Sequence, residues 1–126
     1  MINVKNSLLV IVGSAAGGVL RFWIGSFIQR GVQTKFPLGT FTVNIIGCFV
    51  MGLIMGYIEK SSSTSTTTLS LLLATGLCGG FTTFSAFAFE NIHLLRNQWN
   101  TLAILYMASS IVLGILAVKL GLAIIK

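Results

Sequence analysis

The chain has 126 residues, of which 55% are apolar and only 8% are charged, and its formal net charge is +6. About a quarter of the residues of a soluble domain are charged, because water must solvate its surface, so these figures exclude an ordinary soluble domain. They also exclude intrinsic disorder, which requires a chain poor in apolar residues. A small integral membrane protein remains.

Four apolar stretches follow one another along the chain, at residues 7–28, 38–58, 69–89 and 101–125. A helix rises 1.5 Å per residue, so about 20 apolar residues span a hydrocarbon layer of about 30 Å. We therefore predict an all-α integral membrane protein with four transmembrane helices, forming one domain over residues 1–126.

The first stretch has some features of a secretory signal, with Lys5 before it and small residues at 14–16. However, its apolar character continues through Phe22, Trp23 and Phe27, beyond the short core of a signal peptide. We expect it to be retained as a span.

The connections between the stretches are short. Pro37 suits the first turn of the second helix, and residues 61–68 are eight consecutive Ser or Thr residues that form a low-complexity linker. Residues 90–100 close the third helix and open the fourth, with Trp99 at a membrane interface. We expect His93 to be a helix-end residue and not a ligand or catalytic base.

Enzymatic chemistry has no support in the sequence. Cys48 and Cys78 lie inside apolar stretches without metal-site spacing, so we expect both to be small buried apolar side chains. Because paired carboxylates, an activated nucleophile and a phosphate loop are all missing from the sequence, we expect no enzyme.

Polar residues within the stretches are few, and each must be paired or face a water-filled path. They are Arg21, Thr40, Thr42, Asn44, Thr82, Thr83, Ser85, Tyr106, Ser109 and Ser110. We expect neither acidic residue near a helix centre, whereas proton-coupled transporters commonly need a buried carboxylate or histidine. A path lined by hydrogen-bond donors and lacking carboxylates would suit the passage of an anion.

The third stretch contains Gly79 and Gly80 followed closely by Thr82 and Thr83, which makes a poor segment of helix. A break there would free main-chain carbonyls that can coordinate a cation. The alternative is close helix packing, since Gly76 and Gly80 fit a small-xxx-small pattern. The residues alone leave both alternatives open.

Two other glycine pairs, 13 with 17 and 52 with 56, favour helix packing. Phe84 and Phe87 share a helical face. Such a pair is typical of core packing, but its positive ring edges could also approach an anion. Weak holding of an ion at several sites is what conduction requires.

Three motifs resemble the Fluc (CrcB-like) family of fluoride channels. Residues 17–22 are similar to its G-A-x-x-R-Y motif, residues 39–47 to its G-T-L-x-V-N-x-x-G motif, and residues 79–87 to its Phe-Thr-Thr-Phe-Ser signature. The departures are conservative: Gly18 for alanine, Phe22 for tyrosine, Phe41 for leucine and Ala86 for threonine.

The resemblance implies an antiparallel, dual-topology homodimer with two pores, which exports fluoride passively, lowers cytoplasmic fluoride and excludes chloride. It favours a break of the third helix near Gly79–Thr83 and implies a structural sodium ion at the dimer interface, held by the main-chain carbonyls of Gly79 and Thr82. The chain would lie in the plasma membrane of a prokaryote, the inner membrane if Gram-negative. We expect fluoride, a second copy and the lipid bilayer as partners, and no nucleic acid.

The resemblance also assigns the pore. Its phenylalanine pair would be Phe84 and Phe87, and its pore-lining amide would be Asn44. Arg21 would raise the anion concentration near an entrance. Glu90 is either a vestibule residue or an exposed helix-end carboxylate. The hydroxyls along the pore would come from Thr40, Thr83, Ser85, Tyr106 and Ser110.

Two alternatives compete with a channel. A small multidrug exporter has a similar size and four helices, but it requires a glutamate in its first helix, and this chain has none there. A non-transporting membrane subunit would explain the small-residue contacts but would leave Asn44 and the hydroxyls inside the membrane without a role.

The charges predict insertion in both directions. With four spans, one side of the membrane holds Lys5, Lys60, Lys119 and Lys126, and the other holds Arg21, Arg30, Lys35 and Arg96. Because this even division gives the positive-inside rule no preferred orientation, a reporter fused to the C-terminus should be found on both sides of the membrane. A single fixed orientation would exclude an antiparallel dimer.

Overall fold

The structure, a computed structural model, describes residues 2–126, so of the expected domain 1–126 only Met1 lies outside it. These residues form helices and no strand. In chain order the helical segments are α1 (Val4–Gly31), α2 (Leu38–Lys60), α3 (Thr66–Leu69), the π-helical η1 (Ser70–Cys78), α4 (Gly79–Phe81), α5 (Phe84–Arg96) and α6 (Asn100–Ile125).

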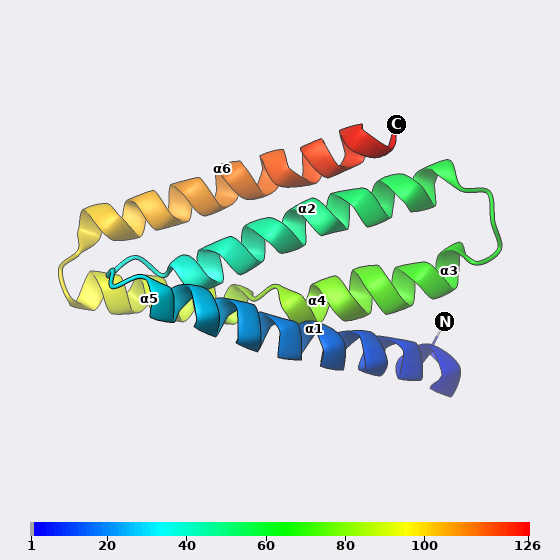
Figure 1. The fold of residues 1–126 in the computed structure, drawn as a ribbon, viewed down its shortest axis with the longest axis horizontal. Coiled ribbons are helices and arrows are strands. Elements are labelled where there is room, and N and C mark those ends of the chain that lie inside the picture. Colours follow the sequence, from blue (N-terminus) through cyan, green and yellow to red (C-terminus); the bar gives the residue numbers. More distant parts are fainter. Residues whose placement is uncertain (1) are drawn as a thin grey trace.

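Within residues 2–126, four helical spans are long and apolar enough to cross a membrane: α1, α2, the composite span Thr66–Arg96 and α6. They run up and down, so that both termini and the connection between α2 and α3 lie at one end of the bundle (Figure 1). The prediction of an all-helical protein with four membrane-crossing helices is confirmed.

The third span is longer than expected. It begins at Thr66, so the last residues of the expected Ser/Thr linker are helical, and it continues past residue 89 to Arg96. His93 lies in its last turn, as predicted. The expectation that neither acidic residue lies near a helix centre holds for Glu59, at the end of α2, but is wrong for Glu90, which lies in the middle of α5.

Glycines bring the spans into close contact. A Cβ atom at Gly17 would lie 2.8 Å from the Phe81 backbone nitrogen, and one at Gly52 would lie 3.0 Å from the Gly121 Cα atom. Backbones at this separation leave no room for a side chain. The predicted packing role of the glycines in α1 and α2 is confirmed.

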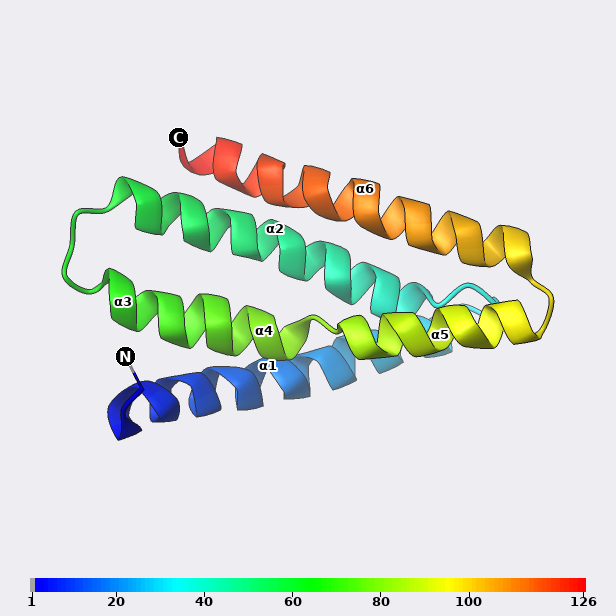
Figure 2. The ribbon, with the colours of Figure 1, turned by 180° about the vertical axis from the view of Figure 1, so that it is seen from behind.

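Gly80 also packs closely, since an added Cβ atom would lie 2.9 Å from the Ser14 Cα atom. The helix stops just beyond it, at Thr82 and Thr83. Both alternatives for this region therefore hold: the glycine packs, and a break follows. Figure 2 shows the break as a thin connection between α4 and α5, near the middle of the bundle.

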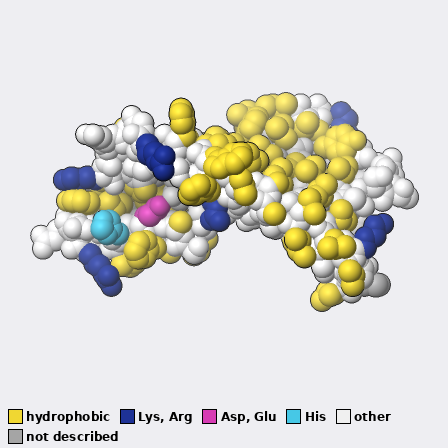
Figure 3. All heavy atoms as spheres, turned by 60° about the horizontal axis from the view of Figure 1, so that its bottom comes forward, with side chains coloured by type: hydrophobic (Ala, Val, Ile, Leu, Met, Phe, Trp, Pro, Cys, Tyr) yellow, Lys and Arg dark blue, Asp and Glu magenta, His cyan; other side chains and the backbone are white. Residues whose placement is uncertain are grey.

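The outer surface suits a lipid environment. Hydrophobic side chains cover much of the face shown in Figure 3, and most of the visible lysine and arginine side chains lie towards its two ends, with one near the middle. Buried side chains cluster where α5 meets α6, around Leu94, Ala103 and Tyr106. This cluster fixes the second half of the third span against α6.

Candidate functional site: a helix break between two cavities

The break in the third span is a local change of backbone conformation over two residues. Thr82 and Thr83 are extended, with φ/ψ of −85°/159° and −148°/119°. The Thr83 hydroxyl oxygen accepts a hydrogen bond of 3.2 Å from the Ala86 backbone N–H. Thr83 thus acts as the N-cap of α5, which is a favourable position for threonine.

Asn44 of α2 fastens the break from a neighbouring helix. Its Oδ1 accepts a hydrogen bond of 2.8 Å from the Thr83 N–H, and its Nδ2 donates one of 3.1 Å to the Thr83 carbonyl. A single amide side chain therefore satisfies both backbone groups of the residue at the break. One hydrogen of the Asn44 amide has no part in this pair.

The break releases two main-chain carbonyls from helical hydrogen bonding. In a continuous α-helix the Thr83 N–H would donate to Gly79 and the Ala86 N–H to Thr82. Here these donors go instead to Asn44 and to the Thr83 hydroxyl. The carbonyl oxygens of Gly79 and Thr82 thus lose their usual donors, and such oxygens are ligands that Na⁺ accepts in broken membrane helices.

Glu90 joins three helices. Its Oε1 accepts a hydrogen bond of 2.6 Å from the Thr40 hydroxyl of α2, and its Oε2 accepts one of 2.6 Å from the Tyr106 hydroxyl of α6. Tyr106 is completely buried, and Glu90 is half-buried within α5. The alternative of an exposed helix-end carboxylate is therefore wrong.

Aromatic rings extend from Tyr106 towards the outer surface. Phe87 packs edge to face against Tyr106, with ring centroids 5.0 Å apart, and Phe84 lies 5.7 Å from Phe87 at an interplanar angle of 40°. Phe84 is 78% exposed in the single chain. It therefore does not pack in the core of this chain, whereas Phe87 does so in part.

A groove of about 290 Å³ lies beside the break. It is lined by Asn44, Cys48, Thr82, Thr83, Phe84, Phe87, Ser110 and Ile111. Among these residues the Ser110 hydroxyl oxygen is buried and has no hydrogen-bond partner in the described chain. A buried polar atom without a partner is costly, so this hydroxyl is available to an occupant of the groove.

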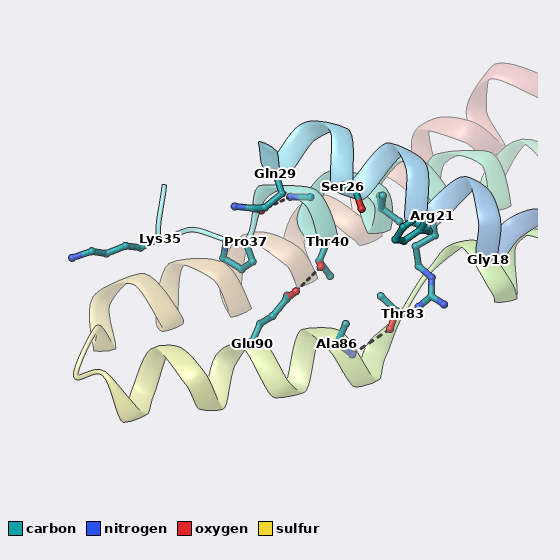
Figure 4. Close-up of a pocket in the computed structure, with 14 residues that line it drawn as sticks. Gly18, Arg21, Ser26, Gln29, Lys35, Pro37, Thr40, Thr83, Ala86 and Glu90 are labelled. Carbon is teal, nitrogen blue, oxygen red and sulfur yellow. Dashed lines mark hydrogen bonds between the residues drawn. The ribbon is translucent and has the colours of Figure 1, made fainter. Parts of the chain in front are cut away.

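A second cavity, of about 500 Å³, lies towards the connection between α1 and α2. Arg21, Thr40, Thr83 and Glu90 are among its lining residues (Figure 4). Figure 4 shows the Glu90 side chain reaching from α5 to Thr40, and the Lys35 side chain extending away from them. Because Thr83 also lines the groove, the break separates the two spaces.

The structure divides the predicted site residues between these spaces. The groove brings together Asn44, Thr82, Thr83, Phe84, Phe87 and Ser110. Arg21, Thr40 and Glu90 lie in the second cavity. Tyr106 is buried behind Phe87, and Ser85 is exposed with its oxygen 3.3 Å from the Thr83 hydroxyl.

Sequence reasoning placed Cys48 in the apolar core, yet this residue is half-buried and lines the groove. The feature of the sequence that could have indicated this position is that Cys48 follows Asn44 by four residues and so lies on the same face of α2. Cys78 is buried, as predicted. No group of three or more His, Cys, Asp or Glu side chains that could hold a metal occurs within residues 2–126.

Comparison with known proteins identifies the family. Residues 8–122 match the family described as "CrcB-like protein, Camphor Resistance (CrcB)". The chain belongs to this CrcB-like family. A "Fluoride-specific ion channel FluC" of Flavobacterium psychrophilum is 45% identical over 122 residues, which cover 97% of this chain and 98% of the relative. The resemblance of the motifs is confirmed.

Further CrcB-like relatives carry the same name. The protein of Methylobacillus flagellatus is 44% identical, covering 94% of this chain and 93% of the relative. That of Phocaeicola vulgatus is 43% identical, covering 93% of this chain and 95% of the relative. Together with the four spans, these bacterial relatives show a multi-pass membrane protein of prokaryotic type.

The two tyrosines of this CrcB-like chain provide a matched test of the Glu90 contact. Tyr106→Phe removes a hydrogen bond to a carboxylate, so it should lower the free energy of unfolding in detergent by about 1–3 kcal/mol. Tyr57→Phe, at an exposed position, should change it by less than about 0.5 kcal/mol. Equal effects of the two substitutions would contradict the structural role of this hydrogen bond.

Proposed function

We propose that the chain is a fluoride-selective channel that lets fluoride leave the cell passively. The relatives described above are named fluoride-specific ion channels, and this chain matches them over almost their whole length. The observation that carries the proposal in this chain is the Ser110 hydroxyl, buried without a partner in a groove that also contains Asn44 and two phenylalanines.

The donors in the groove suit a small, strongly hydrated anion. Fluoride must recover strong hydrogen bonds when it loses water, and a donor can return them when no partner competes for it. Ser110 and the remaining amide hydrogen of Asn44 are such donors. Chloride is larger and a weaker acceptor, so it would gain less from the same groups.

The phenylalanine pair would hold the ion loosely. The edge of an aromatic ring carries the positive end of its quadrupole, so Phe84 and Phe87 can approach an anion without offering a full charge. Phe84 is free to do so because it is exposed in the single chain. Weak binding at several points allows an ion both to enter and to leave.

The second cavity would be the entrance. Arg21 gives it positive charge that raises the local anion concentration. Thr83 lines both spaces and its hydroxyl lies 3.3 Å from that of Ser85, so these two residues would supply polar atoms at the passage between cavity and groove.

Glu90 is compatible with an anion path because hydroxyl donors already stabilise its carboxylate. Both carboxylate oxygens accept short hydrogen bonds, from Thr40 and Tyr106. In this arrangement the two hydroxyls stabilise the Glu90 carboxylate. Either hydroxyl could donate to a passing ion only after its hydrogen bond to Glu90 breaks. Thr40 and Tyr106 would then be indirect contributors to the path.

Proton-coupled drug export is less well supported. An exporter of that class needs an acid in its first helix, and α1 contains none. Glu90 lies in the third span, with each of its oxygens engaged by a hydroxyl. A subunit without transport activity would leave the unpartnered Ser110 hydroxyl unexplained.

The complete channel would be an antiparallel homodimer with two pores. In the single chain the groove is open and Phe84 is 78% exposed, so a second copy is needed to close the path. The even distribution of lysine and arginine between the two sides is consistent with subunits inserted in opposite directions. The dimer would lie in the prokaryotic plasma membrane.

A structural sodium ion fits the residues at the break. The Gly79 and Thr82 carbonyls lack their usual helical donors, and main-chain oxygen is a suitable ligand for Na⁺. Two oxygens from each of two subunits would hold the ion at the dimer interface. Its role would be to neutralise the exposed carbonyl dipoles where the two breaks meet.

Reconstitution tests the proposed function. Purified protein is incorporated into liposomes loaded with potassium fluoride or potassium chloride, valinomycin is added, and efflux is followed with ion-selective electrodes. Fast release of fluoride without release of chloride is expected. Equal release of both ions, or release of neither, would refute a fluoride-selective channel.

Substitution of Phe84 tests the pore in the same assay. Phe84→Ile should lower fluoride efflux about tenfold or more, the effect of losing about 1.4 kcal/mol of favourable interaction. Phe89→Ile, which alters an exposed phenylalanine of α5 that does not line the groove, should conduct normally. Near-normal efflux through a folded Phe84→Ile variant would remove Phe84 from the path.

A further inference from the structure

A row of hydroxyls on α6 ends at a residue without a side chain. Tyr106 and Ser110 are four residues apart and lie on one face of the helix. The next position of this row is Gly114, which is buried. A Cβ atom built there would lie 3.5 Å from the Cys48 Sγ atom. The thiol of α2 therefore faces the place where the row would continue.

Cys48 also continues a row on α2. It follows Asn44 by four residues, so both side chains lie on the same face of the helix. Both line the groove, together with Ser110, whose buried hydroxyl has no partner. Two independent rows, one on each helix, thus meet at the Cys48 thiol.

The other cysteine provides an internal comparison. Cys78 is 2% exposed, and it does not line this groove. Cys48 is half-buried and does line it. The two thiols should therefore differ in their access to a reagent that enters by the groove.

We propose that Cys48 is a further residue of the fluoride path, where its S–H supplies a donor beside Gly114, and that it is a modification site for small thiol-specific reagents. This inference rests on the proposed channel function. A thiol is a weaker donor than a hydroxyl, so at this level the path would hold the ion less strongly than at Ser110.

Methyl methanethiosulfonate is a suitable probe because it is small and uncharged. The Cys48 sulfur loses its proton to the buffer and attacks the sulfenyl sulfur of the reagent. A new S–S bond forms, the bond between the two sulfurs of the reagent breaks, and methanesulfinate leaves with the electron pair. The product carries an apolar CH3S group in a groove of about 290 Å³.

The experiment compares the wild type, Cys48→Ser and Cys78→Ser in fluoride-loaded liposomes, each before and after treatment. Treatment should lower efflux of the wild type and of Cys78→Ser about tenfold or more, because an apolar constriction closes a narrow path. Dithiothreitol should restore it. After treatment, the fluoride efflux rate of Cys48→Ser should equal the rate of the same variant before treatment. Mass spectrometry measures labelling of each cysteine separately.

The outcomes are distinguishable from failure of the proposed function. Channels that conduct fluoride but remain unlabelled at Cys48, or are labelled there without loss of efflux, would overturn the inference and leave the channel function intact. Inhibition that persists in Cys48→Ser would also overturn it. Protein that conducts no fluoride before treatment refutes the proposed function itself, together with the path that Cys48 would line.

Discussion

The paired hydrogen bonds between the Asn44 side chain and the Thr83 backbone are the constraint on which the rest of the site depends. In lipid, each backbone group without a partner costs several kcal/mol, so a helix can be interrupted only where protein or water satisfies it. Asn44 supplies both a donor and an acceptor at one residue. The break can therefore persist in an apolar span.

Several features follow from this interruption. α5 begins afresh at Phe84, with Thr83 as its N-cap. This restart places Phe84 and Phe87 beside the groove and carries Glu90 to the hydroxyls of two other helices. The same interruption removes helical donors from two carbonyls, which suits them to a cation. One amide side chain thus supports both the proposed anion path and the proposed sodium site.

The fold was largely predictable because it rests on local properties. Length and apolar composition indicate four spans, and the small residues at 13, 17, 52 and 56 indicate close packing. The site was less predictable because its contacts join distant parts of the chain. The bond between Thr40 and Glu90 links residues 50 positions apart, and that between Asn44 and Thr83 links residues 39 apart. No periodicity encodes these pairings.

Glu90 illustrates the difference. A carboxylate followed by His93 and Arg96 has the composition of a helix end, and composition alone gave no reason to extend the helix. Its partners made the interior position favourable, since buried charge is tolerated when hydrogen-bonded. Cys48 was misjudged for a similar reason, because an apolar setting in sequence does not show which side chains face a groove between helices.

The most direct measurement of this account is fluoride efflux through Asn44→Asp, beside thermal unfolding and gel filtration of the same sample. The carboxylate can still accept from the Thr83 N–H but cannot donate to its carbonyl, and it places a negative charge in the groove. Asn100→Asp, at the exposed start of α6, is the matched control. We predict that Asn44→Asp remains folded and loses most fluoride efflux while Asn100→Asp conducts normally. Wild-type efflux through Asn44→Asp would contradict the account.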